Sequence, residues 1–150
     1  MPDYLETTID KFIFKVATDR AYSPDGIWAL EEEGGARVRL GLSDYQQQLN
    51  GDMAFAHLKS VGTDLNRGDE FADIETIKAT ASLPSPVSGT VVEINRNLEL
   101  SPELVNEDPY GRGWLAVIEV TDLQADRATL LDADAYLATI RKQPEEELTK

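Results

Sequence analysis

Apolar and polar residues alternate over short stretches along most of this chain, a pattern typical of β-strands rather than long helices. The run Lys11–Val16 is rich in β-branched and aromatic residues and predicts a mostly buried strand. Two further runs, Ile27–Leu30 and Arg37–Leu40, flank Glu33–Gly35. Glycine adopts a positive φ without steric cost, so this segment predicts a β-hairpin.

Short strand-like runs continue through the middle of the chain, with turn residues between them. They are Met53–Leu58, Gly62–Asp64, Asn66–Asp69, Glu70–Thr76, Ala79–Leu83 and Thr90–Ile94. A last strand is expected at Trp114–Val120. Regularly spaced short strands predict a mainly β fold, either a small sandwich or a barrel.

Helices are predicted only as short additions to this β framework. Ser43 and Gln46 have the spacing of a capping box, and Gly51 can end the helix that follows. Pro102 suits the first position of another helix. In the C-terminal segment, Asp132 can cap a helix that runs from Ala133 to about Lys142. We expect residues 143–150 to form a mobile acidic tail.

The length and composition of the chain predict one soluble domain spanning residues 1–150, with residues 1–17 as an N-terminal extension. Its 150 residues suffice for one hydrophobic core. Hydrophobic residues make up 41% and charged residues 28%, which is typical of globular proteins. Neither a signal peptide nor a membrane-spanning run is evident, so we expect a cytoplasmic protein, and a monomer.

The charge and the cysteine content exclude several classes of function. The formal net charge of −14 disfavours nucleic-acid and membrane-surface binding, because phosphate groups are repelled. Cysteine is absent, which excludes disulfide frameworks, thiolate metal sites and cysteine nucleophiles. His57 is the only histidine, which leaves little material for a catalytic triad or a two-histidine metal site.

Lys78 occupies the most informative position in the chain. It lies between two strand-like runs, and no glycine or proline explains the break at Glu75–Ala79. A lysine there would be presented at a hairpin tip. The chain holds only six lysines. A lysine is therefore less expected at a tight turn by chance than in a lysine-rich chain. Spacing alone favours an ordinary solvated turn residue, and an exposed attachment lysine is the alternative.

The segments Gly68–Ala79 and Pro84–Asn95 together resemble the lipoyl-attachment region of the glycine cleavage H-protein family. The similarity continues through Ser101–Asn106, Asp108–Gly111, Gly113–Leu115 and Gly41–Tyr45. It covers roughly residues 22–137. The related biotin carriers also use a hairpin lysine, but they prefer methionine on both sides of it, and Ile77 and Ala79 do not match.

This resemblance implies a lipoyl/biotinyl-type barrel sandwich, the hybrid motif, with short flanking helices and a C-terminal helix. It implies a non-catalytic swinging-arm carrier with lipoate amide-linked to Lys78, in an attachment hairpin that includes Glu75, Ile77 and Ala79. The cofactor then supplies the sulfur chemistry that a chain without cysteine lacks. Implied partners are a lipoylating ligase or transferase and a dihydrolipoamide-dehydrogenase-type enzyme. A homologue that has lost lipoylation is the structural alternative.

One loop departs from the family pattern. The family usually has His-Glu-Trp where this chain has Gly26, Ile27 and Trp28. An isoleucine cannot replace a carboxylate beside an aminomethyl cation, although Asp25 could compensate. The missing glutamate and the long N-terminal extension together favour an H-like lipoate-binding protein of sulfur oxidation, which acts with a heterodisulfide-reductase-like complex. The alternative is a glycine cleavage H protein, acting with glycine decarboxylase and aminomethyltransferase.

Asp25 and Ile27 in this loop are candidates for the arm cleft or for docking. Further candidates rest on the same resemblance. His57 falls in alternation with Met53 and Phe55, which predicts a partly buried structural histidine, with a place in the cleft as the alternative. Trp28 is expected in the core or the cleft wall. Tyr110 and Asn106 lie in a segment that resembles the family's docking loop, for which plain loop packing is the alternative.

Overall fold

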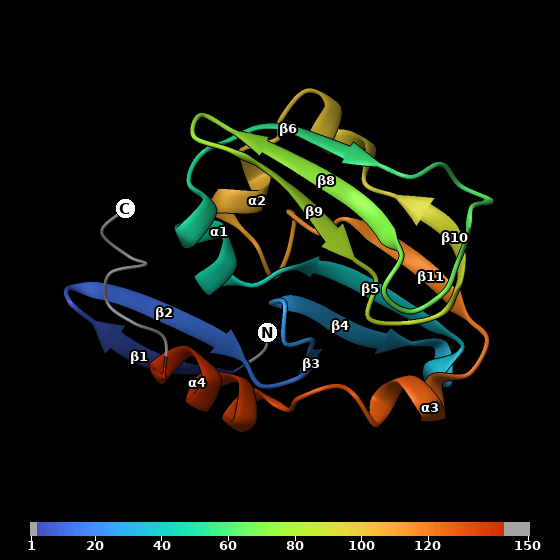
Figure 1. Cartoon of the computed structure of the whole chain (residues 1–150), viewed down its shortest axis with the longest axis horizontal. Coiled ribbons are helices and arrows are strands. Elements are labelled where there is room, and N and C mark those ends of the chain that lie inside the picture. Colours follow the sequence, from blue (N-terminus) through green and yellow to red (C-terminus); the bar gives the residue numbers. More distant parts are fainter. Residues whose placement is uncertain (1–2, 143–150) are drawn as a thin grey trace.

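Three antiparallel sheets form the β framework of the computed structural model, which describes residues 3–142 (Figure 1). The six-stranded sheet has the order β3 (Ala21–Tyr22), β4 (Ile27–Glu32), β5 (Arg37–Leu42), β11 (Ala116–Val120), β10 (Gly89–Ile94) and β7 (Asp64–Leu65). The three-stranded sheet has the order β6 (Met53–Leu58), β8 (Glu70–Thr76) and β9 (Thr80–Pro84). The third is a hairpin of β1 (Tyr4–Ile9) and β2 (Phe12–Ala17).

Short helices surround these sheets. They are α1 (Asp44–Asn50), α2 (Leu104–Glu107), α3 (Leu123–Arg127) and α4 (Ala133–Arg141), with 3-10 turns η1 (Glu33–Gly35) and η2 (Arg96–Glu99). Ser43 caps α1 by accepting a hydrogen bond from the Gln46 amide, and Asp132 caps α4 in the same way. Both caps were predicted from the sequence and are confirmed, but the capping box is incomplete, because the Ser43 amide donates to the Gly26 carbonyl instead of to Gln46. None of the helices in residues 3–142 is long and apolar enough to span a bilayer.

The three-stranded sheet lies over the six-stranded sheet, and the main core fills the space between them (Figure 1). Strand alternation produces this core, because every second side chain of each strand faces inward. Leu40 and Ile118 from one sheet and Phe71 and Ile74 from the other are almost fully buried in it. This arrangement confirms the predicted mainly β sandwich.

A second apolar cluster packs on the opposite side of the six-stranded sheet. Trp28 and Tyr22 contribute from β4 and β3, Phe14 from β2, and Tyr136 from α4. The rings of Tyr22 and Tyr136 stack in parallel at 4.5 Å between centroids. The β1–β2 hairpin and α4 therefore belong to the packed structure and cover this face of the sheet.

Several predicted boundaries are wrong for local reasons. Lys11 is a turn residue rather than part of a strand, because Asp10 and Lys11 both adopt positive φ between β1 and β2. The predicted strand at residues 66–69 is a turn, in which the Asp69 amide donates to the carbonyl of Asn66. The strand expected at residues 62–64 is instead β7, displaced toward Leu65.

The helical segments show smaller differences. Pro102 lies in the turn that precedes α2, rather than at its first position. The last strand begins at Ala116 instead of Trp114. Helix α3 was not predicted, since it is five residues long and has no apolar periodicity. The acidic tail expected at residues 143–150 lies outside the described residues.

Candidate functional site

Lys78 lies at the tip of the β8–β9 hairpin, as the sequence predicted. The turn is closed by the Thr76 amide, which donates to the Ala79 carbonyl at 2.8 Å. The Ala79 amide donates to the Thr76 hydroxyl at 3.2 Å, so the threonine side chain stabilises a turn that has no glycine. Ile77 is 88% exposed at the tip. Both tip side chains are therefore accessible to an enzyme.

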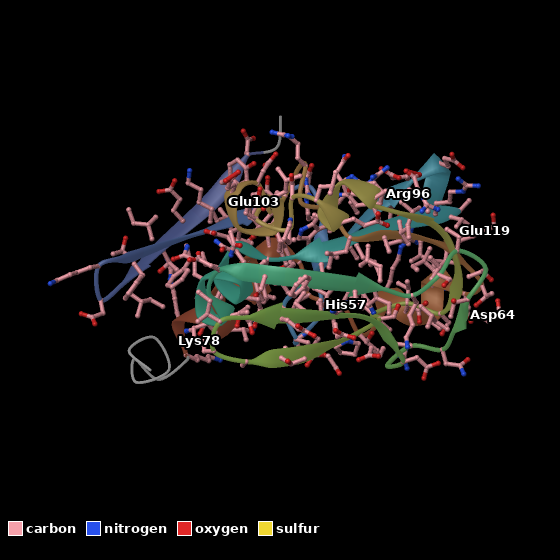
Figure 2. The ribbon with its side chains drawn as sticks, turned by 90° about the horizontal axis from the view of Figure 1, so that it is seen from above. His57, Asp64, Lys78, Arg96, Glu103 and Glu119 are labelled. Carbon is pink, nitrogen blue, oxygen red and sulfur yellow. The ribbon has the colours of Figure 1, made fainter. Side chains whose placement is uncertain are left out.

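The side chain of Lys78 extends to the C-terminal end of α1. Its Nζ donates to the Leu49 carbonyl at 3.1 Å. Figure 2 shows Lys78 at the end of its hairpin. Gly51 ends α1 with φ +88°, and a Cβ built there would lie 3.1 Å from Lys78 Cε. A glycine at this position therefore suits both the helix end and the passage of the lysine stem.

A groove of about 370 Å³ lies beside this contact. Its wall is formed by α1, β9, α4 and the loop before β4. The lining residues are Pro24, Asp25, Tyr45, Gln46, Leu49, Asn50, Ala81, Ser82, Leu83, Pro84, Tyr136, Thr139 and Ile140. The lining is mixed: Leu49, Ala81 and Pro84 are partly exposed and offer apolar contacts to an acyl chain, whereas Leu83 and Ile140 are buried behind it. Among the lining residues in the described part of the chain, Asp25 carries the one carboxylate.

Gly26 and Ile27 are explained by packing. Gly26 has φ +83°, and a Cβ there would lie 2.1 Å from Gln46 Cγ and 2.9 Å from the Tyr136 hydroxyl. The Gln46 side chain thus fills the space next to position 26. Ile27 is fully buried in the core between the sheets, which contradicts its expected place in the cleft. Because neighbours on a strand face opposite sides, Trp28 enters the second cluster.

The remaining cleft and docking candidates are held by internal contacts. Trp28 is 1% exposed, and its Nε1 donates to the Pro109 carbonyl. Asn106 donates to the Gly51 carbonyl and to Gln47, and accepts from the Met53 amide. These bonds fix the segment between α1 and β6. Asn106 thus supports the end of α1 rather than lining the groove.

Tyr110 is also buried, with its hydroxyl donating to the Lys15 carbonyl at 2.6 Å. Its backbone carbonyl accepts from the guanidinium of Arg20. Burial raises the pKa of Tyr110 well above its ordinary value. Of the two interpretations left open by the sequence, loop packing is the one that matches this position. Tyr110 and Asn106 line a second depression, of about 430 Å³, beside the β1–β2 hairpin.

His57 does not occupy the partly buried position that alternation predicted. A β-bulge between Met53 and Phe55 places Met53 in the core while Phe55 is 58% exposed. His57 lies on the same outer face as Phe55, with about half of its side chain exposed, and its Nε2 is 3.3 Å from Glu75 Oε1. Glu75 therefore faces His57 across the strands.

Sequence reasoning missed the residues that receive the lysine. Leu49, Gln46 and Tyr136 come from helices that only the tertiary structure brings next to β9. Gly51 was identified as a helix end, but its proximity to Lys78 could not be read from the pattern. Gln46 was noted only for its spacing to Ser43, which carries no information on its place next to Gly26.

A two-layer barrel sandwich with a lysine on a tight, exposed hairpin beside a partly apolar groove defines the class of lipoyl-type carrier domains. A family model described as "Glycine cleavage H-protein" matches residues 20–143. The chain belongs to the glycine cleavage H-protein family. Members of this family are non-catalytic carriers of lipoate bound to a lysine.

Individual relatives agree with this assignment. The glycine cleavage system H protein of Mycobacterium avium is 41% identical over 128 residues, which cover 83% of this chain and 96% of that protein. The probable glycine cleavage system H protein of Thermococcus kodakarensis is also 41% identical over 128 residues, covering 85% and 94%. The crystal structure of a glycine cleavage system H protein from Mycobacterium marinum superposes with a TM-score of 0.71. It is 30% identical and covers 82% of this chain and 97% of that one.

Proposed function

We propose that this chain is lipoylated on Lys78 and carries the aminomethyl group in glycine cleavage. The observation that carries the proposal is the contact between Lys78 Nζ and the Leu49 carbonyl, which directs the lysine to the edge of the groove. When bound, lipoate supplies a dithiolane that can accept the aminomethyl group on one sulfur. The partly exposed Leu49, Ala81 and Pro84 suit the acyl part of the arm, and Asp25 suits a cationic end.

Three observations support glycine cleavage over sulfur oxidation. The relatives that the chain resembles at about 40% identity carry the name of glycine cleavage H proteins. The difference from the family pattern at Gly26 and Ile27, which favoured a sulfur carrier, is explained by packing. Ile27 lies in the core, and the Gln46 side chain fills the space beside Gly26. Asp25 also remains at the groove, where it can replace the missing glutamate.

The implied partners follow from this proposal. They are the glycine decarboxylase, the aminomethyltransferase and the dihydrolipoamide dehydrogenase of a glycine cleavage system, and a ligase or transferase that attaches lipoate. The exposed turn at Lys78 suits recognition by such an enzyme, and the exposed Ile77 and the nearby Glu75 are the side chains it would contact.

The test begins with the intact mass of the native protein, where we expect one lipoyl increment. Peptide masses after proteolysis should place this increment on a peptide containing Lys78. Lys78→Arg should abolish the increment and all aminomethyl loading by glycine decarboxylase. Lys11→Arg is the matched control, because Lys11 also lies at a hairpin turn and should leave modification unchanged. Lipoylation without aminomethyl loading, together with sulfur-bearing adducts on the native arm, would support the sulfur-oxidation alternative instead.

A further inference from the structure

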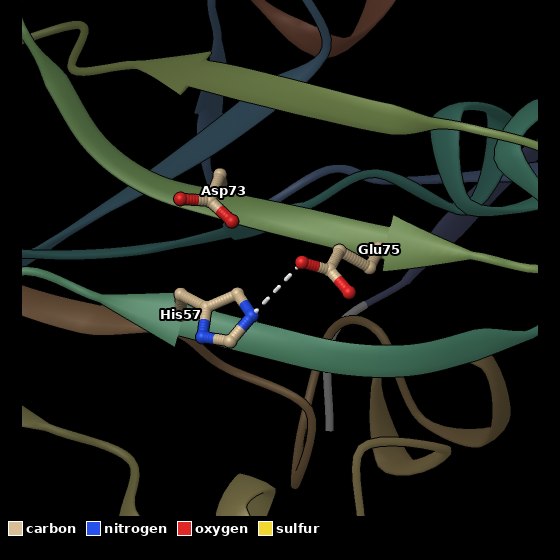
Figure 3. A group of neighbouring side chains, drawn as sticks. All are labelled: His57, Asp73 and Glu75. Carbon is tan, nitrogen blue, oxygen red and sulfur yellow. Dashed lines mark ion pairs between the residues drawn. The ribbon is translucent and has the colours of Figure 1, made fainter.

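His57, Asp73 and Glu75 form a cluster on the outer face of the three-stranded sheet (Figure 3). His57 on β6 lies directly opposite Asp73 on β8 in the strand register. Glu75 follows two residues later on β8, so its side chain is on the same face as that of Asp73. Two adjacent hydrogen-bonded strands therefore present one imidazole and two carboxylates together.

The three side chains are close enough to share an ion. One ligand atom from each residue lies within 4.8 Å of the other two, and His57 Nε2 is 3.3 Å from Glu75 Oε1. Tetrahedral zinc bonds of about 2.0–2.2 Å require ligand atoms roughly 3.4 Å apart, which rotation of the exposed side chains can provide. The Phe55 ring lies beside the imidazole on the same face, at 6.0 Å between centroids and 19° between planes.

The charges of the cluster favour a cation. Within residues 3–142 no hydrogen bond or ion pair reaches the Asp73 carboxylate, and Glu75 contacts only His57 through its side chain. The nearby Lys59 is already paired with Glu70 at 3.4 Å. Two carboxylates thus face one imidazole on a chain of net charge −14, and a bound cation would relieve their repulsion.

We propose that His57, Asp73 and Glu75 bind a divalent transition-metal ion of the zinc type, with water completing its coordination. An imidazole nitrogen with two carboxylate oxygens suits Zn²⁺ or Co²⁺, whereas Mg²⁺ and Ca²⁺ prefer oxygen ligands alone. The absence of cysteine from the sequence removes thiolates as competing ligands. This site is separate from the groove beside Lys78, and it does not depend on the cargo of the arm.

Zn²⁺ titration of the untagged full-length chain, followed by calorimetry, tests the proposal. We expect one ion per chain, with affinity lowered about tenfold or more by His57→Gln, Asp73→Asn or Glu75→Gln. Glu6→Gln is the matched control, since it removes the same charge from an exposed strand residue in another sheet, and should leave affinity unchanged. All titrations are repeated in the Lys78→Arg background, so that lipoyl sulfurs cannot be the ligands.

A second measurement identifies the ligand directly. His57 is the only histidine, so its ring nitrogens give a single, unambiguous set of NMR signals. Stoichiometric Zn²⁺ should shift one ring nitrogen strongly. No binding, binding that survives His57→Gln, an unmoved ring signal, or an equal loss in Glu6→Gln would each overturn the proposal. Glycine-cleavage activity plays no part in these readouts, so their failure leaves the proposed carrier function untouched.

Discussion

Lys78 Nζ donates a hydrogen bond to the carbonyl of Leu49 at 3.1 Å, across 29 residues of sequence. The acceptor lies in the last turn of α1, which contains no basic residue of its own. The lysine ammonium therefore supplies the positive charge that favours a helix C-terminus. The acylation proposed for Lys78 would remove that charge and so change the contact that positions the side chain.

Replacing Lys78 by methionine should lower the free energy of unfolding by a few tenths of a kcal/mol, because the exposed charge–dipole contact is lost. The loss should shrink in about 0.5 M salt, where surface charges are screened. Urea denaturation at low and high salt measures both effects. Lys78→Arg keeps the charge and should match the parent chain, so equal behaviour of the two variants at low salt would contradict the contact's role.

Gly26→Ala should destabilise the protein by about 2 kcal/mol, since it combines positive φ with a clash against Gln46. Gly34→Ala is the control that separates the two causes. Gly34 also has positive φ, +68°, but a Cβ there meets nothing within 4 Å. The excess loss at Gly26 should fall in the double variant with Gln46→Ala, as a double-mutant cycle would measure. Equal losses at the two glycines would exclude the clash.

Asp25→Asn should shorten the lifetime of the aminomethyl-loaded form if the groove holds the cationic end of the arm. A charge-assisted contact contributes on the order of 1.5–3 kcal/mol, so release should speed up about tenfold or more. Mass spectrometry over time after loading measures the lifetime. The lipoylation level should stay unchanged, and Glu6→Gln serves as the charge control. An unaltered lifetime would remove Asp25 from the site.

Stability should fall steeply in alkali because burial raises the pKa values of Tyr22, Tyr110 and Tyr136 above the ordinary 10. Above pH 10 the unfolded chain loses tyrosine protons that the folded chain keeps, so unfolding becomes more favourable as pH rises. Each such tyrosine costs up to about 1.4 kcal/mol per pH unit.

Urea midpoints measured from about pH 9 to about pH 12 test this expectation. Tyr22→Phe should flatten the decline, at the cost of the hydrogen bond from its hydroxyl to the Ala17 carbonyl. Tyr4→Phe is the control, because Tyr4 is 42% exposed and lies outside this buried set. A slope identical in both variants would show that alkaline unfolding has another cause.

Local chemistry made the hairpins and caps predictable. Ser43 and Asp132 mark helix starts through side-chain hydrogen bonds that depend only on near neighbours. The turn at residues 33–35 likewise follows from its glycines. Lys78 stood out only as an isolated lysine at a turn, and its proposed role as the attachment site came from the family resemblance.

Tertiary packing decided what the sequence pattern could not. Simple alternation placed His57 with Met53, but one bulge moved the histidine to the outer face. Ile27 was a candidate for the arm cleft from its alignment with a family glutamate, whereas the register of β4 turns it into the core. The groove is built by α1 and α4 against β9, contacts that no local pattern encodes.

The helix that receives Lys78 is braced on two sides. On one side the Lys15 amide donates to Asp44, and Gln48 donates to the Ile13 carbonyl. On the other, Asn106 holds the Gly51 carbonyl. The site that receives the Lys78 side chain is therefore preorganised. Folding has already ordered the end of α1, so no further backbone entropy is lost when a group docks there. An arm attached at Lys78, as proposed, would lose only its own freedom on docking there, so its residence time would reflect the arm and its load rather than loop closure.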